Sequence, residues 1–364
     1  MKTIYPKIVL FILLFPAIAF AGNDFNGRYT KTKKINKEFN VSSDALLEID
    51  NSYGKIDIKT WDQNRVVIEV VIKTNGNDEE EVLDRLKEIS VDFAVSRSHV
   101  SAQTLLEDRD SSWWQKLLGG WNNDVNIEIN YTIKAPVTNS VDLENDYGSI
   151  RLDKLKGNAQ INCDYGRLFI GQLLGENNSL NFDYTRGSHI DYIKRGKINA
   201  DYSEFTIDEA ETLELSADYS ESQIGKVENI AFNCDYGSLN LGKVKNIKGR
   251  GDYLRTNLGA VYNSAEVNMD YGSLAIEKIM KSAENMVIST DYTSVKIGYE
   301  PDTPFSFEVS LQYGNLNGID EEGFEIMKRR QENTEQYYQG YHISPNEGPV
   351  VKIETEYGNV TFED

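Results

Sequence analysis

An aspartate stands directly before a tyrosine at regular intervals along most of this 364-residue chain. Carboxylate oxygens are calcium ligands, so aspartates stacked in a row could hold calcium ions between neighbouring repeats. Alternatively, each carboxylate accepts hydrogen bonds from backbone N–H groups at a corner, and the asparagines two residues earlier pair their amides along the stack. The second interpretation is favoured, because calcium takes about six to eight oxygens and a flat row offers few to any one ion. The nine aspartates are Asp146, Asp164, Asp183, Asp201, Asp218, Asp235, Asp252, Asp270 and Asp291. The calcium candidates among them are Asp183, Asp201, Asp218 and Asp235, and the asparagines are Asn162, Asn181, Asn199, Asn233 and Asn268.

A local polar cluster carries residue types that polysaccharide-cleaving β-helices use on one sheet face. It consists of Asp183, Arg186, His189, Asp191 and Lys194, where one repeat holds an extra residue. A solvated, irregular corner explains the same residues equally well. The three histidines lie far apart in sequence, and the chain has no His-Glu-x-x-His motif, no Gly-x-Ser-x-Gly motif and no phosphate-cradling glycine loop. The sequence therefore nominates no catalytic residue, no cofactor and, apart from the calcium candidates, no metal site, and it predicts a protein without enzymatic activity.

Three of the four tryptophans lie within residues 111–123. On a short helix, Trp113 and Trp114 share one face with two leucines. That face either packs on the rest of the protein or forms an exposed aromatic tip that contacts a glycan, a partner protein or a membrane interface. Trp113, Trp114 and Trp121 are therefore candidate partner contacts.

The elements that position these residues are short strands of one repeated unit. Apolar residues alternate up to each tyrosine, as in Ile230, Phe232 and Cys234, and resume three, five and often eight positions after it. Period two predicts a strand with one buried face. The slip in phase predicts a corner at the Tyr-Gly step, where glycine allows backbone angles that a Cβ forbids. From Tyr147 to Tyr313 the steps are 17 to 21 residues. Twelve of the 21 tyrosines belong to the repeat: Tyr53, Tyr147, Tyr165, Tyr184, Tyr202, Tyr219, Tyr236, Tyr253, Tyr271, Tyr292, Tyr313 and Tyr357.

Two short strands per repeat, with no helical stretch between them, predict an all-β protein built as a single-stack β-solenoid of coils of about 18 residues. A β-propeller would need blades of about 40 residues, which is twice the observed period. A left-handed hexapeptide solenoid would need a six-residue apolar period, which this chain lacks.

Two further columns of equivalent residues follow from the repeat. The tyrosines are in phase with the buried strand positions, which predicts stacked rings at the edge of the core; an exposed aromatic row that binds sugars is the alternative. Cys163 and Cys234 each stand one residue before Asp-Tyr, four coils apart, which is roughly 19 Å at the strand spacing. That separation is too large for a disulfide, so both are predicted to be free, buried thiols.

The signal-like N-terminus, the Tyr53-Gly54 coil, a long interruption and the Asp-Tyr-Gly-Ser-(Ile/Leu)-x-(Ile/Leu) coils together resemble the bacterial putative-adhesin family, whose secreted domains have no known function. The resemblance covers most of the chain after residue 21. It implies a right-handed, largely single-stack β-helix at or near the cell envelope, and it brings no catalytic residues with it.

The regions outside the regular coils are predicted to be a signal peptide and two insertions that cap or flank the ends of the solenoid. In residues 1–21, lysines precede an apolar run that ends in Ala-x-Ala, which predicts a signal peptide and a chain exported to the periplasm, the cell surface or the medium, without a transmembrane span. Residues 22–61 form the first strands and coil, and residues 62–140 form a small α/β insertion with a charged helix around residues 78–89. Residues 141–316 form the solenoid repeats, residues 317–349 a second insertion, and residues 350–364 a final coil.

Composition narrows the function further. A formal charge of −20 argues against a nucleic-acid partner, because phosphate binding needs clustered Lys and Arg. Two cysteines exclude a disulfide scaffold. The sequence therefore predicts an adhesin-like or cell-envelope interaction protein whose partner is a glycan or a surface protein. A carbohydrate-active β-helix enzyme and a periplasmic structural or stress-related component are the alternatives.

Overall fold

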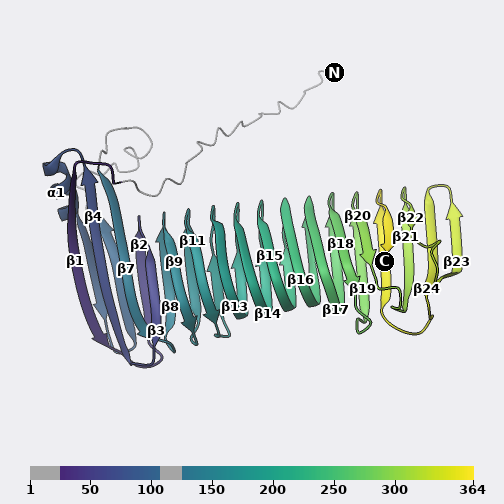
Figure 1. Cartoon of the computed structure of the whole chain (residues 1–364), viewed down its shortest axis with the longest axis horizontal. Helices are drawn as coiled ribbons and strands as arrows, with labels where there is room; N and C mark the ends of the chain where they lie inside the picture. The colour runs from purple at the N-terminus through teal and green to yellow at the C-terminus, as the bar shows by residue number, and fades with distance from the viewer. Residues whose placement is uncertain (1–24, 107–124) are drawn as a thin grey trace, which may run out of the picture.

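The protein is an all-β rod in the computed structural model, which describes residues 25–106 and 125–364 (Figure 1). These residues contain 26 strands, which belong to one hydrogen-bonded sheet, and one α-helix of ten residues. The predicted all-β class is thus confirmed. The signal peptide predicted at residues 1–21 and the candidates Trp113, Trp114 and Trp121 lie outside the described residues. Within the described part of the chain, no helix has the length and apolar character needed to cross a membrane.

The N-terminal part adds strands beside both strands of the first repeat, β2 and β3. Its strand β7 lies parallel to β3 and antiparallel to β4, which pairs with β1, whereas β6 lies parallel to β2 and antiparallel to β5. The predicted helix around residues 78–89 is α1, whose first turn is capped by the Asp78 carboxylate accepting from the backbone N–H groups of Glu80 and Glu81. The elements are β1 (Tyr29–Asn40), β2 (Leu46–Ser52), β3 (Ile56–Trp61), β4 (Arg65–Gly76), α1 (Glu79–Glu88), β5 (Ile89–Val95), β6 (His99–Leu106) and β7 (Asn126–Pro136).

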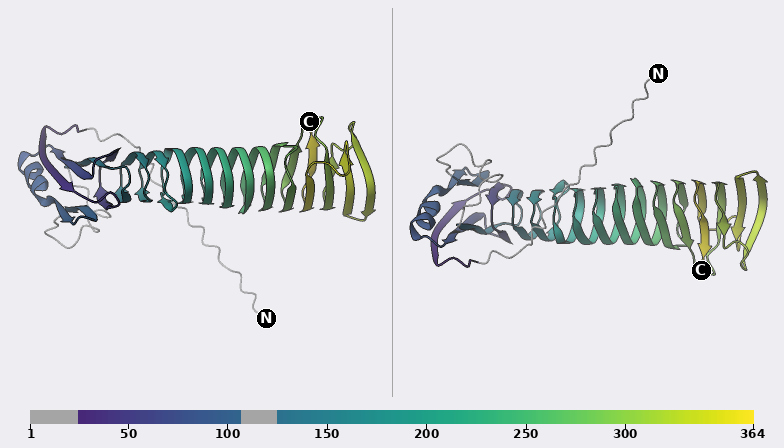
Figure 2. Two further views of the ribbon diagram at one scale, coloured as in Figure 1. Left: turned by 90° about the horizontal axis from the view of Figure 1, so that it is seen from below. Right: turned by 90° about the horizontal axis from the view of Figure 1, so that it is seen from above.

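The middle of the chain is a stack of repeats in which each strand lies parallel to the equivalent strand of the next repeat. The segments before each tyrosine form one column and the segments after it form the other, here called the pre-tyrosine and post-tyrosine columns. Strands β13 to β17 run through both columns. The two views in Figure 2 show these strands on two sides of a narrow interior. The strands are β8 (Ser140–Asp146), β9 (Ser149–Leu155), β10 (Ala159–Asp164), β11 (Arg167–Leu173), β12 (Asn178–Asn181), β13 (Arg186–Asn199), β14 (Glu204–Ser216), β15 (Glu221–Asn233), β16 (Gly237–Asp252), β17 (Leu254–Asp270), β18 (Ser273–Ile279), β19 (Asn285–Asp291) and β20 (Ser294–Gly298).

Alternating side chains build the interior. In β15, Ile224, Val227, Ile230 and Phe232 point inward and are buried, whereas the residues between them are mostly exposed. The parallel registers join residues 17 to 21 positions apart, for example Glu204 with Glu221 and Asp270 with Asp291. No repeat can bury its apolar face alone, so stability depends on contact between neighbouring repeats.

Cys163 and Cys234 are free and buried, as predicted. Burial raises the pKa of each thiol to about 12, so both remain protonated and act as small core residues.

At the C-terminal end, the repeats follow one another in space in a different order from that in the sequence. The prediction that residues 350–364 form the last coil of the stack, beyond the second insertion, is wrong. Strand β25 pairs with β19 on one side and β21 on the other, so the last repeat in sequence lies inside the stack. The outer edge of β21 is covered by the antiparallel hairpin of β24 and β23. Figure 1 accordingly shows the C-terminus before the end of the rod. The strands are β21 (Phe305–Gln312), β22 (Leu316–Asn317), β23 (Phe324–Glu332), β24 (Glu335–His342), β25 (Val350–Glu356) and β26 (Val360–Glu363).

Candidate functional site

The twelve repeat tyrosines form one continuous stack of rings, which we call the tyrosine ladder. Eleven consecutive contacts join them, with ring centroids 4.6–5.5 Å apart and ring planes within 2–8° of parallel. Tyr357 lies between Tyr292 and Tyr313, because its repeat inserts there. The predicted stacking of the rings is therefore confirmed over the whole length of the repeats.

The position of the ladder differs from the prediction. Nine of the twelve tyrosines are exposed, with fractional exposures of 43–51%. The cause is the backbone, since all twelve have φ between 49° and 62°, in the left-handed region that non-glycine residues rarely adopt. This conformation interrupts the strand alternation and turns each ring outward. The prediction that the rings lie in phase with the core was wrong because it continued period two through the corner.

Where a glycine follows the tyrosine, it leaves room for the backbone of the neighbouring repeat. At Gly148, an added Cβ would lie 1.5 Å from the carbonyl oxygen of Gly54 in the neighbouring repeat, and at Gly166 it would lie 1.8 Å from that of Gly148. Neither glycine has a positive φ, so the prediction that glycine supplies unusual backbone angles was wrong. One other repeat carries Leu254 at this position, and four carry serine or threonine. Ser220 is one of them, and its side chain accepts from the backbone N–H of Ser203 at 2.9 Å.

The ladder presents ring edges and phenol hydroxyls to solvent. Each inner ring has a neighbouring ring over both faces at 4.6–5.5 Å, so a sugar cannot lie flat on it. Desolvation, followed by the neighbouring phenols and aspartates, raises the pKa of Tyr236 and Tyr271. These hydroxyls stay protonated at neutral pH and are available as hydrogen-bond donors.

The aspartate row is tied to the backbone. The Oδ1 of Asp183 accepts from the backbone N–H of Asp201 at 3.0 Å, and Asp235 does the same for Asp252 at 2.9 Å. The amide of Asn199 donates to Asn181, which in turn donates to Asn162, at 2.6 and 2.8 Å. The hydrogen-bonded interpretation of these columns is thus confirmed in this part of the stack. The calcium candidates Asp183, Asp201, Asp218 and Asp235 each accept such a bond, and calcium binding by them stays a prediction.

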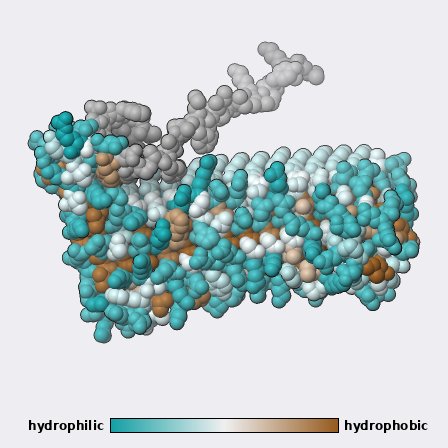
Figure 3. Space-filling model, viewed as in Figure 1, coloured by the Kyte–Doolittle hydropathy of each residue, from teal (hydrophilic) through white to brown (hydrophobic). Residues whose placement is uncertain are grey.

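A shallow groove of about 590 Å³ runs beside the ladder across four repeats. Its walls are Tyr219, Tyr236, Tyr253 and Tyr271 on one side and the residues two positions after each of these tyrosines on the other. Those residues are Glu221, Ser238, Arg255 and Ser273. Sequence reasoning missed them, although their fixed offset of two positions after each tyrosine was a usable signal. The even spacing of the repeats is visible along the upper edge of the surface (Figure 3).

A group of acidic side chains faces solvent near the start of the pre-tyrosine column. Glu144 of β8 lies opposite Asp50 of β2, and Asp142 lies opposite Glu48. Burial, followed by neighbouring carboxylates, raises the pKa of Asp142, Glu144 and Asp146. A carboxyl with a raised pKa in the folded state binds protons more tightly there than in the unfolded chain. Its contribution to stability is therefore present at low pH and is lost as pH rises through the folded pKa.

We therefore expect Glu144→Gln to melt a few degrees above the wild type at pH 7, with the difference closing as pH falls toward about 4. Thermal unfolding at a series of pH values measures this. Glu354→Gln is the matched control, because Glu354 of β25 lies between Ser289 and Ser310 and lacks acidic partners across the strands. An equal change in melting temperature for both substitutions would show that the acidic neighbours of Glu144 do not lower the stability of the protein.

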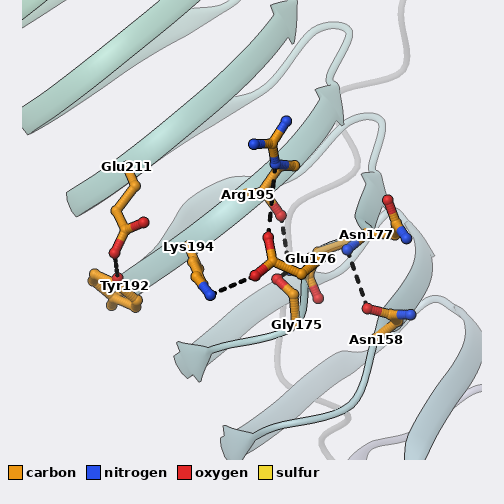
Figure 4. Close-up of polar contacts among 9 residues, drawn as sticks. Asn158, Gly175, Glu176, Asn177, Tyr192, Lys194, Arg195 and Glu211 are labelled. Carbon is orange, nitrogen blue, oxygen red and sulfur yellow. Dashed lines mark hydrogen bonds and ion pairs between the residues drawn. The ribbon is translucent and has the colours of Figure 1, made fainter.

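The polar cluster predicted at residues 183–194 does not converge. Asp183 belongs to the aspartate row, and Lys194 forms an ion pair with Glu176 of the preceding repeat. Figure 4 shows Lys194 and Arg195 both directed at Glu176, and Tyr192 donating to Glu211 at 2.5 Å. Only His189 and Asp191 come together, with Nε2 and Oδ1 3.1 Å apart. Their third partner, Asp208, lies in the next repeat and could not be found from the local sequence.

No protein-family model matches the chain, and no curated protein matches it in sequence. Solved structures resemble it only distantly. They include one named a putative adhesin from Parabacteroides merdae, with 9% identity, coverage of 91% of this chain and 97% of the other, and a TM-score of 0.35. A putative cell adhesion protein from Clostridium sporogenes has 11% identity, coverage of 91% and 99%, and a TM-score of 0.20. A structure named a putative lipid binding protein, from Parabacteroides distasonis, has 8% identity, coverage of 91% and 97%, and a TM-score of 0.26. At these TM-scores and identities, the likenesses carry no argument about function.

Proposed function

We propose that this chain is an exported, non-enzymatic β-solenoid of the right-handed β-helix type that binds an extended, uncharged polysaccharide of the cell envelope or cell surface along its tyrosine ladder. The observation that carries the proposal is the row of stacked phenols, in which the eight consecutive rings from Tyr202 to Tyr313 are exposed, with a groove beside four of them. The parallel registers of 17 to 21 residues and the two strand columns support the solenoid assignment.

The spacing of the ladder fits a polymer better than a single small molecule. The rings recur every 4.6–5.5 Å, which is close to the advance of one sugar in an extended β-linked polysaccharide. Each phenol can then donate one hydrogen bond to a successive sugar. A single hydrogen bond contributes only about 0.5–1.5 kcal/mol, so affinity arises from repetition along the row.

Charge narrows the class of polysaccharide. The protein has a formal charge of −20, and the aspartate row runs beside the ladder. Like charges repel a polyanion and slow its approach. A neutral glycan with many hydroxyl groups avoids this repulsion and offers acceptors to the phenols.

Co-sedimentation with insoluble cellulose and chitin, and with alginate gel as a polyanion, tests the proposal. We expect binding to a neutral polymer and none to alginate. The triple variant Tyr219→Phe, Tyr236→Phe, Tyr253→Phe keeps the stack but removes three hydroxyls, and it is expected to weaken binding about tenfold.

The matched control removes three hydroxyls away from the ladder, as Tyr192→Phe, Tyr262→Phe, Tyr341→Phe, and it is expected to bind like the wild type. Equal binding by the two triple variants, or binding to neither neutral polymer, would contradict the proposal.

A further inference from the structure

One group of side chains outside the ladder combines the donors of a metal site. It lies on the post-tyrosine column, where His189 and Asp191 come from β13 and Asp208 comes from the neighbouring β14. The His189 Nε2 is 3.1 Å from an Asp191 oxygen and 3.5 Å from an Asp208 oxygen, and the three ligand atoms all lie within 4.8 Å of one another. It is the one such group of histidine, cysteine and carboxylate side chains found in residues 25–106 and 125–364.

The hydrogen bonds around the imidazole fix which nitrogen faces the carboxylates. The Nδ1 of His189 lies 2.7 Å from the Thr206 hydroxyl, and that hydroxyl donates to the Ser188 carbonyl at 3.5 Å. The hydroxyl therefore accepts from Nδ1–H. In the neutral imidazole, Nε2 then directs its lone pair toward two carboxylates, which leaves a position for a cation between the three atoms.

The distances fit a metal ion as that cation. Zinc binds histidine nitrogen and carboxylate oxygen at about 2.0–2.2 Å, so two ligands at tetrahedral or octahedral angles lie about 3.0–3.5 Å apart. The distances from Nε2 to the two carboxylate oxygens, 3.1 and 3.5 Å, fall in this range. A ligating histidine also needs its other nitrogen held by an acceptor, which Thr206 provides.

The surrounding repeats leave the site open. The residues opposite Asp191 and Asp208 in the outer neighbouring repeats are Gly171 and Gly225. Neither carries a side chain that could cover the carboxylates. All three ligand side chains are partly exposed, so water can complete the coordination of a bound ion.

We propose that His189, Asp191 and Asp208 bind one divalent transition-metal ion of the zinc class. This proposal is independent of polysaccharide binding, because none of the three residues lines the ladder or its groove. Imidazole with two carboxylates suits zinc, and one nitrogen ligand makes magnesium and calcium poor competitors.

Titration with zinc chloride, followed by calorimetry and by NMR of the histidine side chains, tests the proposal on the intact chain. The sequence has three histidines, so His99 and His342 serve as internal references. We expect one zinc ion per chain and perturbation of the His189 signals only. Excess magnesium should not displace the zinc.

Variants distinguish zinc binding at this site from nonspecific zinc binding to the protein surface. We expect Asp208→Asn to abolish saturable zinc binding and Thr206→Val to weaken it about tenfold through loss of the orienting hydrogen bond. The matched control is Glu48→Gln, because Glu48 is the one carboxylate that pairs with His99 among the described residues, at 2.9 Å. Zinc that perturbs His99 as strongly as His189, or binding that Asp208→Asn leaves unchanged, would overturn the proposal, and so would the absence of saturable binding.

Discussion

Replacing Gly148 with alanine is expected to lower the free energy of unfolding by about 3 kcal/mol or more. The new Cβ would lie 1.5 Å from the Gly54 carbonyl oxygen and 2.9 Å from the amide nitrogen of Asn145. The Asn145 amide donates to that same carbonyl at 3.0 Å, so separating the two repeats also breaks a partly buried hydrogen bond. The first of these obstacles is backbone, which cannot rotate away as a flexible side chain could.

The urea midpoint of unfolding measures the effect. Ser149→Ala is the matched control, because it changes the next residue of the same corner, which already carries a Cβ, and is expected to shift stability by about 0.5 kcal/mol or less. Near-equal midpoints for the two variants would mean that repeats at this end can separate freely, contrary to the close stacking described above.

Replacing Tyr236 in the middle of the ladder with alanine is expected to cost about 2–3 kcal/mol. Its ring stacks on Tyr219 and on Tyr253, both at 4.8 Å, and alanine removes both contacts. Tyr236 also has φ of 54° and donates its N–H to the Asp252 carbonyl at 2.9 Å. Alanine keeps the strained backbone, whereas glycine relieves it.

Tyr236→Gly is therefore expected to be more stable than Tyr236→Ala by about 1 kcal/mol, the reverse of the order in an extended strand. Comparing the urea midpoints of the two variants isolates the backbone strain from the ring contacts. If alanine were the more stable replacement, the left-handed conformation of the ladder would carry no measurable cost.

The periodic features of the fold could be predicted because they depend on local alternation. The spacing of Tyr219, Tyr236 and Tyr253 by 17 residues predicted equivalent positions in adjacent repeats, and their rings do stack. Cys163 and Cys234 were placed in the interior for the same reason, and both are buried.

Other features depend on contacts that alternation does not encode. A left-handed residue at the corner reverses the direction of the side chain, so the tyrosines point outward. The spatial order of the C-terminal repeats depends on hairpin β23–β24 covering β21, which leaves β25 between β19 and β21. Asp208 joins His189 because their strands are adjacent, although the residues are 19 positions apart in the sequence.

The most direct test of the proposed function is the affinity for a series of neutral β-linked oligosaccharides, from the disaccharide to the octasaccharide, measured by calorimetry. If the ligand lies along the tyrosine ladder, each added sugar meets another phenol and Kd falls with every step of the series. The ladder triple variant should show a shallower dependence on length. An affinity that levels off at the disaccharide or trisaccharide would place binding in a compact site and contradict the ladder as the binding surface.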